Sequence, residues 1–348
     1  MQKKRVIWVD IAKFICIFCV MNSHLESKTK ILFSFYVPFY LSLFFFCSGY
    51  VYRGNERFSV FFRKKVKQLF VPWLVFSNLN ILLSQILSFN KHKALGEEVV
   101  WNLLQIRGKG DGLWFVAALF VAYLPFYFVI LWLNKKEVTV KRLCFLVCVV
   151  WGLSCICDLY TRFSTLGLFR WGNNNLPWHM EYIFFAMFYM ILGYLFRKKL
   201  EVQFDKLNTK KFCAGISIIY VVLVLAFKHL FGNNPVTEIV VNYVLQLMGI
   251  SAVISISKFI KPNKYILYIG ENTLLCFAFH GKIYSFMQTM LKKIAEDVYY
   301  YILNDIIYST ILSVVLTIVL SVILIIPIKI TNKYFPNLIG RKRNSKKS

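Results

Sequence analysis

Residues 8–24 read WVDIAKFICIFCVMNSH, an apolar stretch that carries ionisable side chains at both of its ends. Asp10 and Lys13 lie near its start, and His24 closes it. A stretch of this length and composition is typical of a helix that crosses a lipid bilayer. Ionisable groups are costly inside a bilayer and are therefore candidates for function. Asp10, Lys13 and His24 are the first three candidates in this chain.

The rest of the chain has the same apolar character. Hydrophobic residues make up 58% of the 348 residues, which include 34 Phe and 20 Tyr, more apolar surface than a water-soluble domain could bury. Backbone exposed to lipid must satisfy its own hydrogen bonds, and no series of short alternating strands occurs, so we expect helices. The sequence predicts an all-α polytopic membrane helix bundle of about ten spans, at residues 7–23, 31–51, 69–89, 113–133, 143–159, 179–196, 212–231, 238–257, 265–290 and 306–328.

The positive charges are concentrated in alternate segments between these spans. Nearly all of the net charge of +26 lies in residues 1–5, 53–67, 134–142, 197–211, 258–264 and 329–348. By the positive-inside rule, these segments and both termini are expected to be cytoplasmic. We attribute the charge to topology and to contact with membrane lipids, and we expect no nucleic-acid partner.

The organisation predicted is one membrane domain over residues 1–348, with a short basic cytoplasmic tail at 331–348. The first span is expected to stay in the membrane, because no small-residue cleavage site follows it. The chain has nine cysteines, and Cys16 and Cys19 form a CxxC inside an apolar run with no second pair at zinc spacing. We interpret them as packing residues and predict no metal and no disulfide.

The spacing in the first span places its charges on one helical face. Lys13 and His24 are eleven residues apart, about 16 Å along a helix and close to three full turns. Asp10 precedes Lys13 by three residues and is expected to pair with it. A purely structural alternative has Lys13 extending to the interface and His24 ending the helix.

A second histidine strengthens the functional interpretation. His280 ends the pattern YIGENTLLCFAFH and is expected at a similar depth in the span 265–290, on one face with Thr273 and Cys276. Two histidines at one depth could line a single polar cavity. The alternative for His280 is an interhelical hydrogen bond that only packs the bundle.

Six patterns in order make the chain resemble a known family. They are Arg5, Asp10, Lys13 and His24 at the start, then LFFFCSGYVYR, FFRKKVKQLFVPW, LWFVAALF, LPWHMEYIFFAMFYMILGYLFRK and IGENTLLCFAFH. Together they resemble the acyltransferase family 3 membrane proteins, which O-acylate surface and cell-wall glycans of bacteria. The family more often has Arg at the position of Lys13, although Lys occurs in its sugar O-acetylase branch.

The resemblance implies an O-acetyltransferase in the bacterial inner (plasma) membrane. It implies acetyl-CoA, or another acyl-CoA, as cytoplasmic donor, and a glycan or lipid-linked saccharide as acceptor. His24 and His280 are the expected catalytic residues, since imidazole titrates in the range useful to a general base. The donor carries phosphates, so the cofactor-binding residues are expected to be Lys13 with Asp10, and the basic loop with Arg53, Arg63 and Lys67.

Three further residues are candidates for binding the acceptor: Trp114, His179 and Glu181. Each can also be an ordinary residue of the membrane interface. Ser48 and Gly49 are expected to allow close helix approach rather than to react. Two other functions stay open from the sequence: a transporter or exporter of a polysaccharide or lipid-linked intermediate, and a membrane scaffold.

Overall fold

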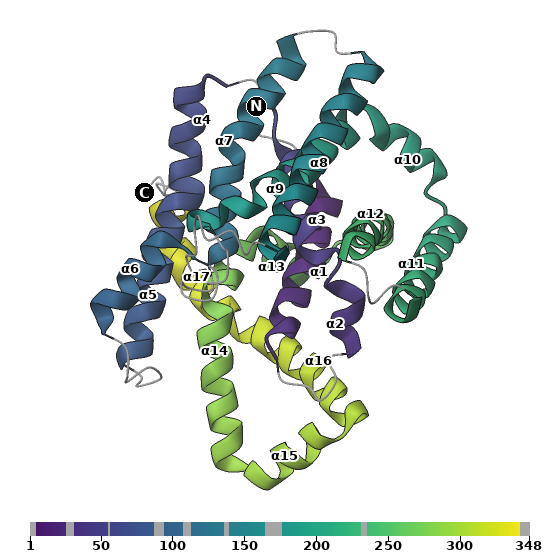
Figure 1. Ribbon diagram of the computed structural model, residues 1–348. Helices are drawn as coiled ribbons and strands as arrows, with labels where there is room; N and C mark the ends of the chain where they lie inside the picture. Colours follow the sequence, from purple (N-terminus) through teal and green to yellow (C-terminus); the bar gives the residue numbers. More distant parts are fainter. Residues whose placement is uncertain are drawn as a thin grey trace. The chain divides into compact units, whose positions relative to one another are not determined.

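Helices make up nearly all of the computed structural model, which describes residues 5–25, 31–54, 56–86, 94–106, 113–135, 139–163, 176–230 and 235–341 (Figure 1). Within these ranges there is no strand. The all-α polytopic bundle predicted from the hydrophobic runs is therefore confirmed.

The helices belong to two compact units, each assembled from separate parts of the sequence. Unit 1 consists of Met1–Cys47 and Phe196–Lys329, and unit 2 of Ser48–Leu195 and Ile330–Ser348. The single domain predicted over residues 1–348 stays a prediction. The elements of unit 1 are α1 (Ile7–Ser23), α2 (Ile31–Tyr36), most of α3 (Tyr40–Val51), the π-helical turn η4 (Phe196–Leu200), α10 (Glu201–Leu207), α11 (Lys210–Leu230), α12 (Pro235–Phe259), α13 (Lys264–Glu271), α14 (Thr273–Ile294), α15 (Glu296–Asn304), α16 (Ile306–Ile323) and the first half of α17 (Ile325–Tyr334).

Unit 1 is built around α1, which packs against α12, α13, α14 and α16. Ile11, Ala12, Cys16 and Met21 of α1 are completely buried. The approach to α13 is closest at Gly270, where an added Cβ would lie 2.0 Å from the carbonyl oxygen of Asp10. Figure 1 shows the chain turning through the short α15 between α14 and α16. The first helix is therefore held on several sides by helices from the end of the chain.

The beginning of α1 is also tied to α10 and α12. The indole Nε1 of Trp8 donates to Glu201 over 3.0 Å, and the Lys258 ammonium binds the same carboxylate at 3.0 Å. Lys258 also pairs with Asp205 at 2.7 Å. These contacts fix the end of α1 that carries Asp10 and Lys13.

In unit 2, α7 and α8 both pack against α9. Gly49 allows the end of α3 to approach α9, since an added Cβ there would lie 1.9 Å from the carbonyl oxygen of Met190. This close contact agrees with the packing role expected for the Ser48–Gly49 pair. The unit contains α4 (Phe58–Lys65), the π-helical turn η1 (Val66–Phe70), α5 (Val71–Ile86), α6 (Leu95–Leu104), α7 (Trp114–Lys135), α8 (Val140–Phe163), η3 (Pro177–Tyr182), α9 (Ile183–Leu195) and η5 (Pro336–Ile339).

Eight helical segments among the described residues are long and apolar enough to cross a membrane. They correspond to eight of the ten predicted spans, and the segment Ile31–Val51 has the predicted limits. The predicted span 7–23 is also a helix, α1, of 17 residues with Asp10 and Lys13 inside it. The predicted span 265–290 is divided at Asn272, whose side chain donates to the carbonyl of Tyr268 over 2.7 Å.

One segment differs from its prediction. The basic loop expected from Arg53 to Lys67 is helical from Phe58 onward, because Phe61 is buried and stacks on Tyr127 with ring centres 4.7 Å apart.

The basic cytoplasmic tail expected at residues 331–348 stays a prediction. Its first part holds the end of α17 and the turn η5, in which Pro336 and Ile339 are buried. Residues 342–348 of that tail lie outside the described residues.

Candidate active site

Asp10 is the centre of a charged cluster in unit 1. One of its carboxylate oxygens accepts from Arg5 Nε at 2.5 Å, and the other lies 2.9 Å from Lys13 Nζ. Arg5 also forms an ion pair with Glu271 of α13 at 3.2 Å, and it donates a hydrogen bond to the carbonyl of Leu267 at 3.0 Å. The pairing of Asp10 with Lys13 predicted from their spacing is confirmed, and the structure adds Arg5 and Glu271 to it.

The cluster combines two cations with two carboxylates. Burial lowers the pKa of Arg5, whereas its hydrogen bond to Asp10 and the charges of Asp10 and Glu271 raise it, and the net shift of the pKa is upward. Arg5 therefore stays a cation, and Asp10 is buried between two positive charges. Asp10 is therefore shared between Arg5 and the Lys13 ammonium, whose side chain is 25% exposed.

The two candidate histidines lie next to each other. The ring of His24, directly after α1, has its centre 5.0 Å from the ring centre of His280 on α14, and the planes are inclined by 51°. His24 is exposed, whereas His280 is buried. His280 Nδ1 lies 2.9 Å from the carbonyl oxygen of Phe277 and 3.2 Å from that of Cys276. The expectation that both histidines reach one depth of the bundle is correct.

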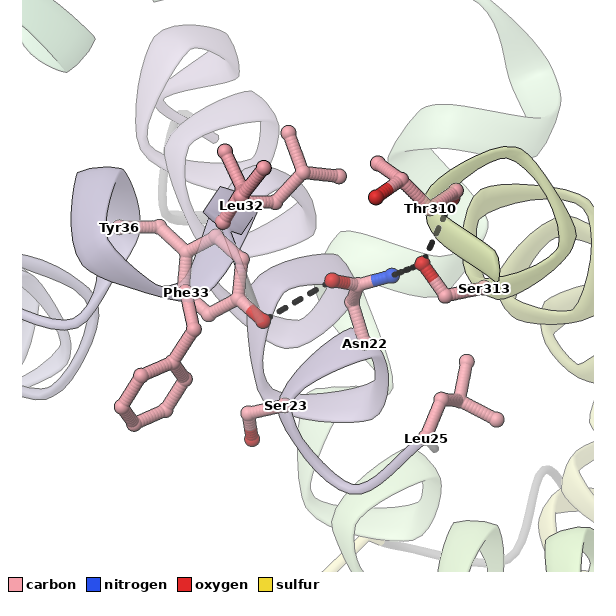
Figure 2. Close-up of a pocket in the computed structure, with 9 residues that line it drawn as sticks. Asn22, Ser23, Leu25, Leu32, Phe33, Tyr36, Thr310 and Ser313 are labelled. Carbon is pink, nitrogen blue, oxygen red and sulfur yellow. Dashed lines mark hydrogen bonds between the residues drawn. The ribbon is translucent and has the colours of Figure 1, made fainter. Parts of the chain in front are cut away.

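Asn22 holds the last turn of α1, immediately before His24 (Figure 2). Its amide nitrogen donates to Thr317 at 3.1 Å and to Ser313 at 3.3 Å, and its oxygen accepts from the Tyr36 hydroxyl at 2.9 Å. Figure 2 shows Asn22 between Tyr36 and Ser313 at the wall of a small, mainly polar pocket. The turn that presents His24 is therefore anchored to both α2 and α16.

The hydroxyl groups of α16 form a buried row that the sequence reading missed. Ser309, Ser313, Thr317 and Ser321 follow at intervals of four residues and are all buried. The Ser321 hydroxyl contacts the Tyr265 hydroxyl of α13. The spacing could have predicted this row, because hydroxyl side chains repeated every four residues in an otherwise apolar helix lie on one helical face.

The remaining predicted donor-binding residues belong to unit 2. Arg53 follows α3, whereas Arg63 lies on α4 and Lys67 on η1, and all three side chains are exposed. Their neighbour Lys65 lies over the Tyr123 ring, 3.3 Å from its centre. Gly340, with φ of +67°, packs against the backbone of Lys67. The basic segment around Lys65 and Lys67 is therefore held by packing against Tyr123 and Gly340.

The three predicted acceptor-binding residues lie together in unit 2. The ring of Trp114 is centred 5.1 Å from that of His179, and His179 Nδ1 lies 3.3 Å from Glu181 Oε1. Glu181 also accepts from the backbone N–H of Leu176 at 3.1 Å. His179 and Glu181 are buried, and Trp114 is half-buried. Of the three, Trp114 has the most accessible surface for a ligand.

The backbone of this group adopts an uncommon conformation. Trp178 and His179 are consecutive left-handed residues, with φ of 59° and 53°. Left-handed backbone is uncommon for residues other than glycine and concentrates at functional sites. Trp178 is held in place by Trp73, with ring centres 4.6 Å apart, and lies parallel to the Phe70 ring. The sequence offered no signal for this turn beyond Pro177.

Comparison with known proteins identifies the family of the chain. A family model described as an acyltransferase domain matches residues 6–329, from just before α1 into α17. No characterised protein and no solved structure matches the chain. Because the family match covers nearly the whole length, the protein belongs to acyltransferase family 3 and is a multi-pass membrane acyltransferase.

Proposed function

We propose that this acyltransferase is an O-acetyltransferase of the bacterial inner (plasma) membrane. It moves the acetyl group of cytoplasmic acetyl-CoA to a hydroxyl of an extracytoplasmic glycan or lipid-linked saccharide. The observation that carries the proposal is the arrangement on α1, where an ion-paired lysine lies near the predicted cytoplasmic end and the His24–His280 pair at the other end.

The donor is assigned to the cationic residues. Lys13 is expected to bind a phosphate as a point charge, with Asp10 holding the ammonium in place. Arg53, Arg63 and Lys67 are exposed cations of the kind that bind phosphate groups, and the proposal assigns them to the donor as well. The distance from Lys13 to His24 along α1, about 16 Å, is on the order of an extended pantetheine arm.

The acceptor is assigned to Trp114, His179 and Glu181. An aromatic face is suited to packing against the apolar C–H groups of a sugar ring, and Trp114 has the accessible ring. The buried His179 packs against that ring, and Glu181 contacts His179.

His24 is proposed as the general base for the transfer. As the acceptor oxygen attacks the thioester carbonyl, His24 takes the hydroxyl proton and a C–O bond forms. The tetrahedral intermediate then breaks its C–S bond, and the proton on His24 passes to the departing sulfur. The products are an acetylated sugar and free coenzyme A, and the imidazole returns to its neutral form.

The test replaces His24 and measures acetylation of glycans. His24→Ala is expected to lower acetyl transfer by about 10²–10⁴-fold, the usual contribution of a general base, and to leave abundance and coenzyme A binding intact. His24→Gln is expected to lower acetyl transfer by a similar factor, because the amide side chain can still form hydrogen bonds but cannot take the proton from the acceptor hydroxyl. Mass spectrometry of glycans from cells with each variant measures the product.

Ser23→Ala is the matched control, since this neighbour on the same turn bonds only to the carbonyl of Val20 among the contacts described. It is expected to keep normal acetylation. Normal acetylation by His24→Gln would contradict the mechanism. Unchanged acetylation in cells that lack the protein, together with accumulation of a saccharide intermediate, would instead support the transporter alternative.

A further inference from the structure

The hydrogen bonds of His280 determine which of its ring nitrogens carries the proton. Nδ1 faces two carbonyl oxygens, those of Phe277 at 2.9 Å and Cys276 at 3.2 Å. A carbonyl oxygen can only accept a hydrogen bond, so Nδ1 must be the N–H donor. In the neutral ring, Nε2 is then the nitrogen with the lone pair.

His24 is the neighbouring group that can use this lone pair. Its ring centre lies 5.0 Å from that of His280, which leaves room for one N–H···N hydrogen bond of about 3 Å between facing nitrogens. The Phe277 ring, centred 5.7 Å from that of His280, also packs against the imidazole. His280 is therefore fixed by its own helix and by an apolar neighbour.

The two histidines are unequal in access. His280 is 5% exposed and has one nitrogen committed to backbone carbonyls, whereas His24 is exposed at the end of α1. A group that removes a proton from a substrate hydroxyl must come within hydrogen-bonding distance of it. This requirement favours His24 for contact with substrate and leaves His280 to act through it.

We propose that His280 is a positioning residue that selects the tautomer of His24. Its Nε2 accepts an N–H from His24, so the other nitrogen of His24 presents a lone pair to the acceptor hydroxyl. This assignment rests on the proposed acetyl transfer. When His24 takes the hydroxyl proton, the imidazolium keeps its hydrogen bond to His280, which stays neutral throughout, and the proton then leaves with the coenzyme A sulfur.

The arrangement has the same logic as a triad in which a buried group orients a catalytic histidine. In this protein the buried group is an uncharged imidazole, so it costs less to hold in an apolar environment than a carboxylate. It also makes the orientation of His24 dependent on the contact between α1 and α14, which belong to the same unit.

The first experiment reads the tautomers directly. The full-length protein, labelled with ¹⁵N-histidine, is placed in lipid bilayers and studied by solid-state NMR; the chain has five histidines. We expect His280 in the Nδ1–H form, identified by loss of its signals in His280→Phe, and His24 in one dominant tautomer that becomes a mixture in that variant. An Nε2–H form of His280, or an unchanged His24 signal in His280→Phe, would overturn the proposal.

The second experiment compares two replacements by their kinetics. His280→Gln carries an amide oxygen that can accept in place of Nε2, and it is expected to keep acetyl transfer within about tenfold of the wild-type rate. His280→Phe is expected to lose roughly 10²-fold in kcat with little change in KM. Equal losses in the two variants would overturn the proposal, and thermal unfolding shows whether either variant is misfolded.

Phe277→Leu is the matched control, because it changes the packing of His280 and leaves the backbone carbonyl that accepts from Nδ1. It is expected to keep the wild-type tautomers. The NMR result is obtained without substrate, so it stands or fails separately from acetyl transfer. If the wild-type protein gives no acetylated product while the tautomers are as expected, the proposed function fails and the hydrogen-bond assignment holds. If His24→Gln acetylates normally, the general-base role of His24 fails instead.

Discussion

Asp10 binds two cations at once, and this shared contact decides what a change at Lys13 does. Arg5 and Lys13 occupy different oxygens of its carboxylate. Losing Lys13 therefore leaves the buried carboxylate paired with Arg5, so the fold is expected to survive. Losing Asp10 would leave two cations without this partner, a more costly change for the protein.

Lys13→Ala is accordingly expected to weaken acetyl-CoA binding in a folded protein. A charge-assisted contact of about 1.5–3 kcal/mol predicts a rise in Kd of roughly tenfold to 100-fold. Lys13→Arg is expected to retain most of the affinity, because the phosphate responds mainly to charge. Isothermal titration with purified protein in detergent measures both values.

Lys211→Ala is the matched control for this prediction. It removes one positive charge from an exposed lysine at the start of α11, in the same unit. It is expected to keep the wild-type Kd. An unaltered Kd in Lys13→Ala would remove Lys13 from the donor site, and an equal loss in Lys13→Ala and Lys13→Arg would argue against a simple role of charge.

At the scale of elements, the packing of α1 on α13 depends on one glycine. An added Cβ at Gly270 would meet the backbone of Asp10 at 2.0 Å, and backbone cannot move aside as a flexible side chain can. Gly270→Ala is therefore expected to push the two helices apart and to cost about 1–3 kcal/mol, as overpacking does. Thermal unfolding in detergent and coenzyme A binding measure the two consequences.

Gly215→Ala on α11 provides the comparison, because nothing lies within 4 Å of an added Cβ there. Alanine is the better helix former, so this change is expected to be neutral or slightly stabilising. If Gly270→Ala were as stable as Gly215→Ala, the close approach of α1 and α13 would be incorrect, and with it the position assigned to Glu271 beside Arg5.

At the scale of the whole molecule, the proposed function depends on orientation in the membrane. The basic segments predict that a reporter fused after Lys211 is cytoplasmic and that one placed near Gly110 is extracytoplasmic. Paired alkaline phosphatase and green fluorescent protein fusions measure the two positions. A reversed pattern would place His24 on the side of the donor and would contradict the route from acetyl-CoA to the glycan.

The sequence by itself determined the helices and the local part of the site. A span is decided by hydrogen bonds within a few residues and by the apolar character of one continuous run, so the segment Ile31–Val51 and the helix Ile7–Ser23 were predicted with their limits. The Asp10–Lys13 pair was predictable for the same reason, since it spans less than one helical turn.

Interruptions of helices were harder to predict. Phe58 begins a helix where a basic loop was expected, because the aromatic contacts that favour it come from α7. Asn272 divides a predicted span, because its side chain donates to a backbone carbonyl in competition with the helical backbone hydrogen bonds. Hydropathy does not detect this competition.

Tertiary structure alone decided which side chains meet. His24 and His280 come from opposite ends of the sequence, and Asn22 finds Ser313 and Thr317 across a similar separation. Lipid-facing and helix-facing surfaces are both apolar in a membrane protein, so hydropathy does not show which face of α1 meets α14 or α16. Close packing of small residues such as Gly270 and the hydrogen bonds of buried polar groups make that choice, and both exist only once the helices are in contact.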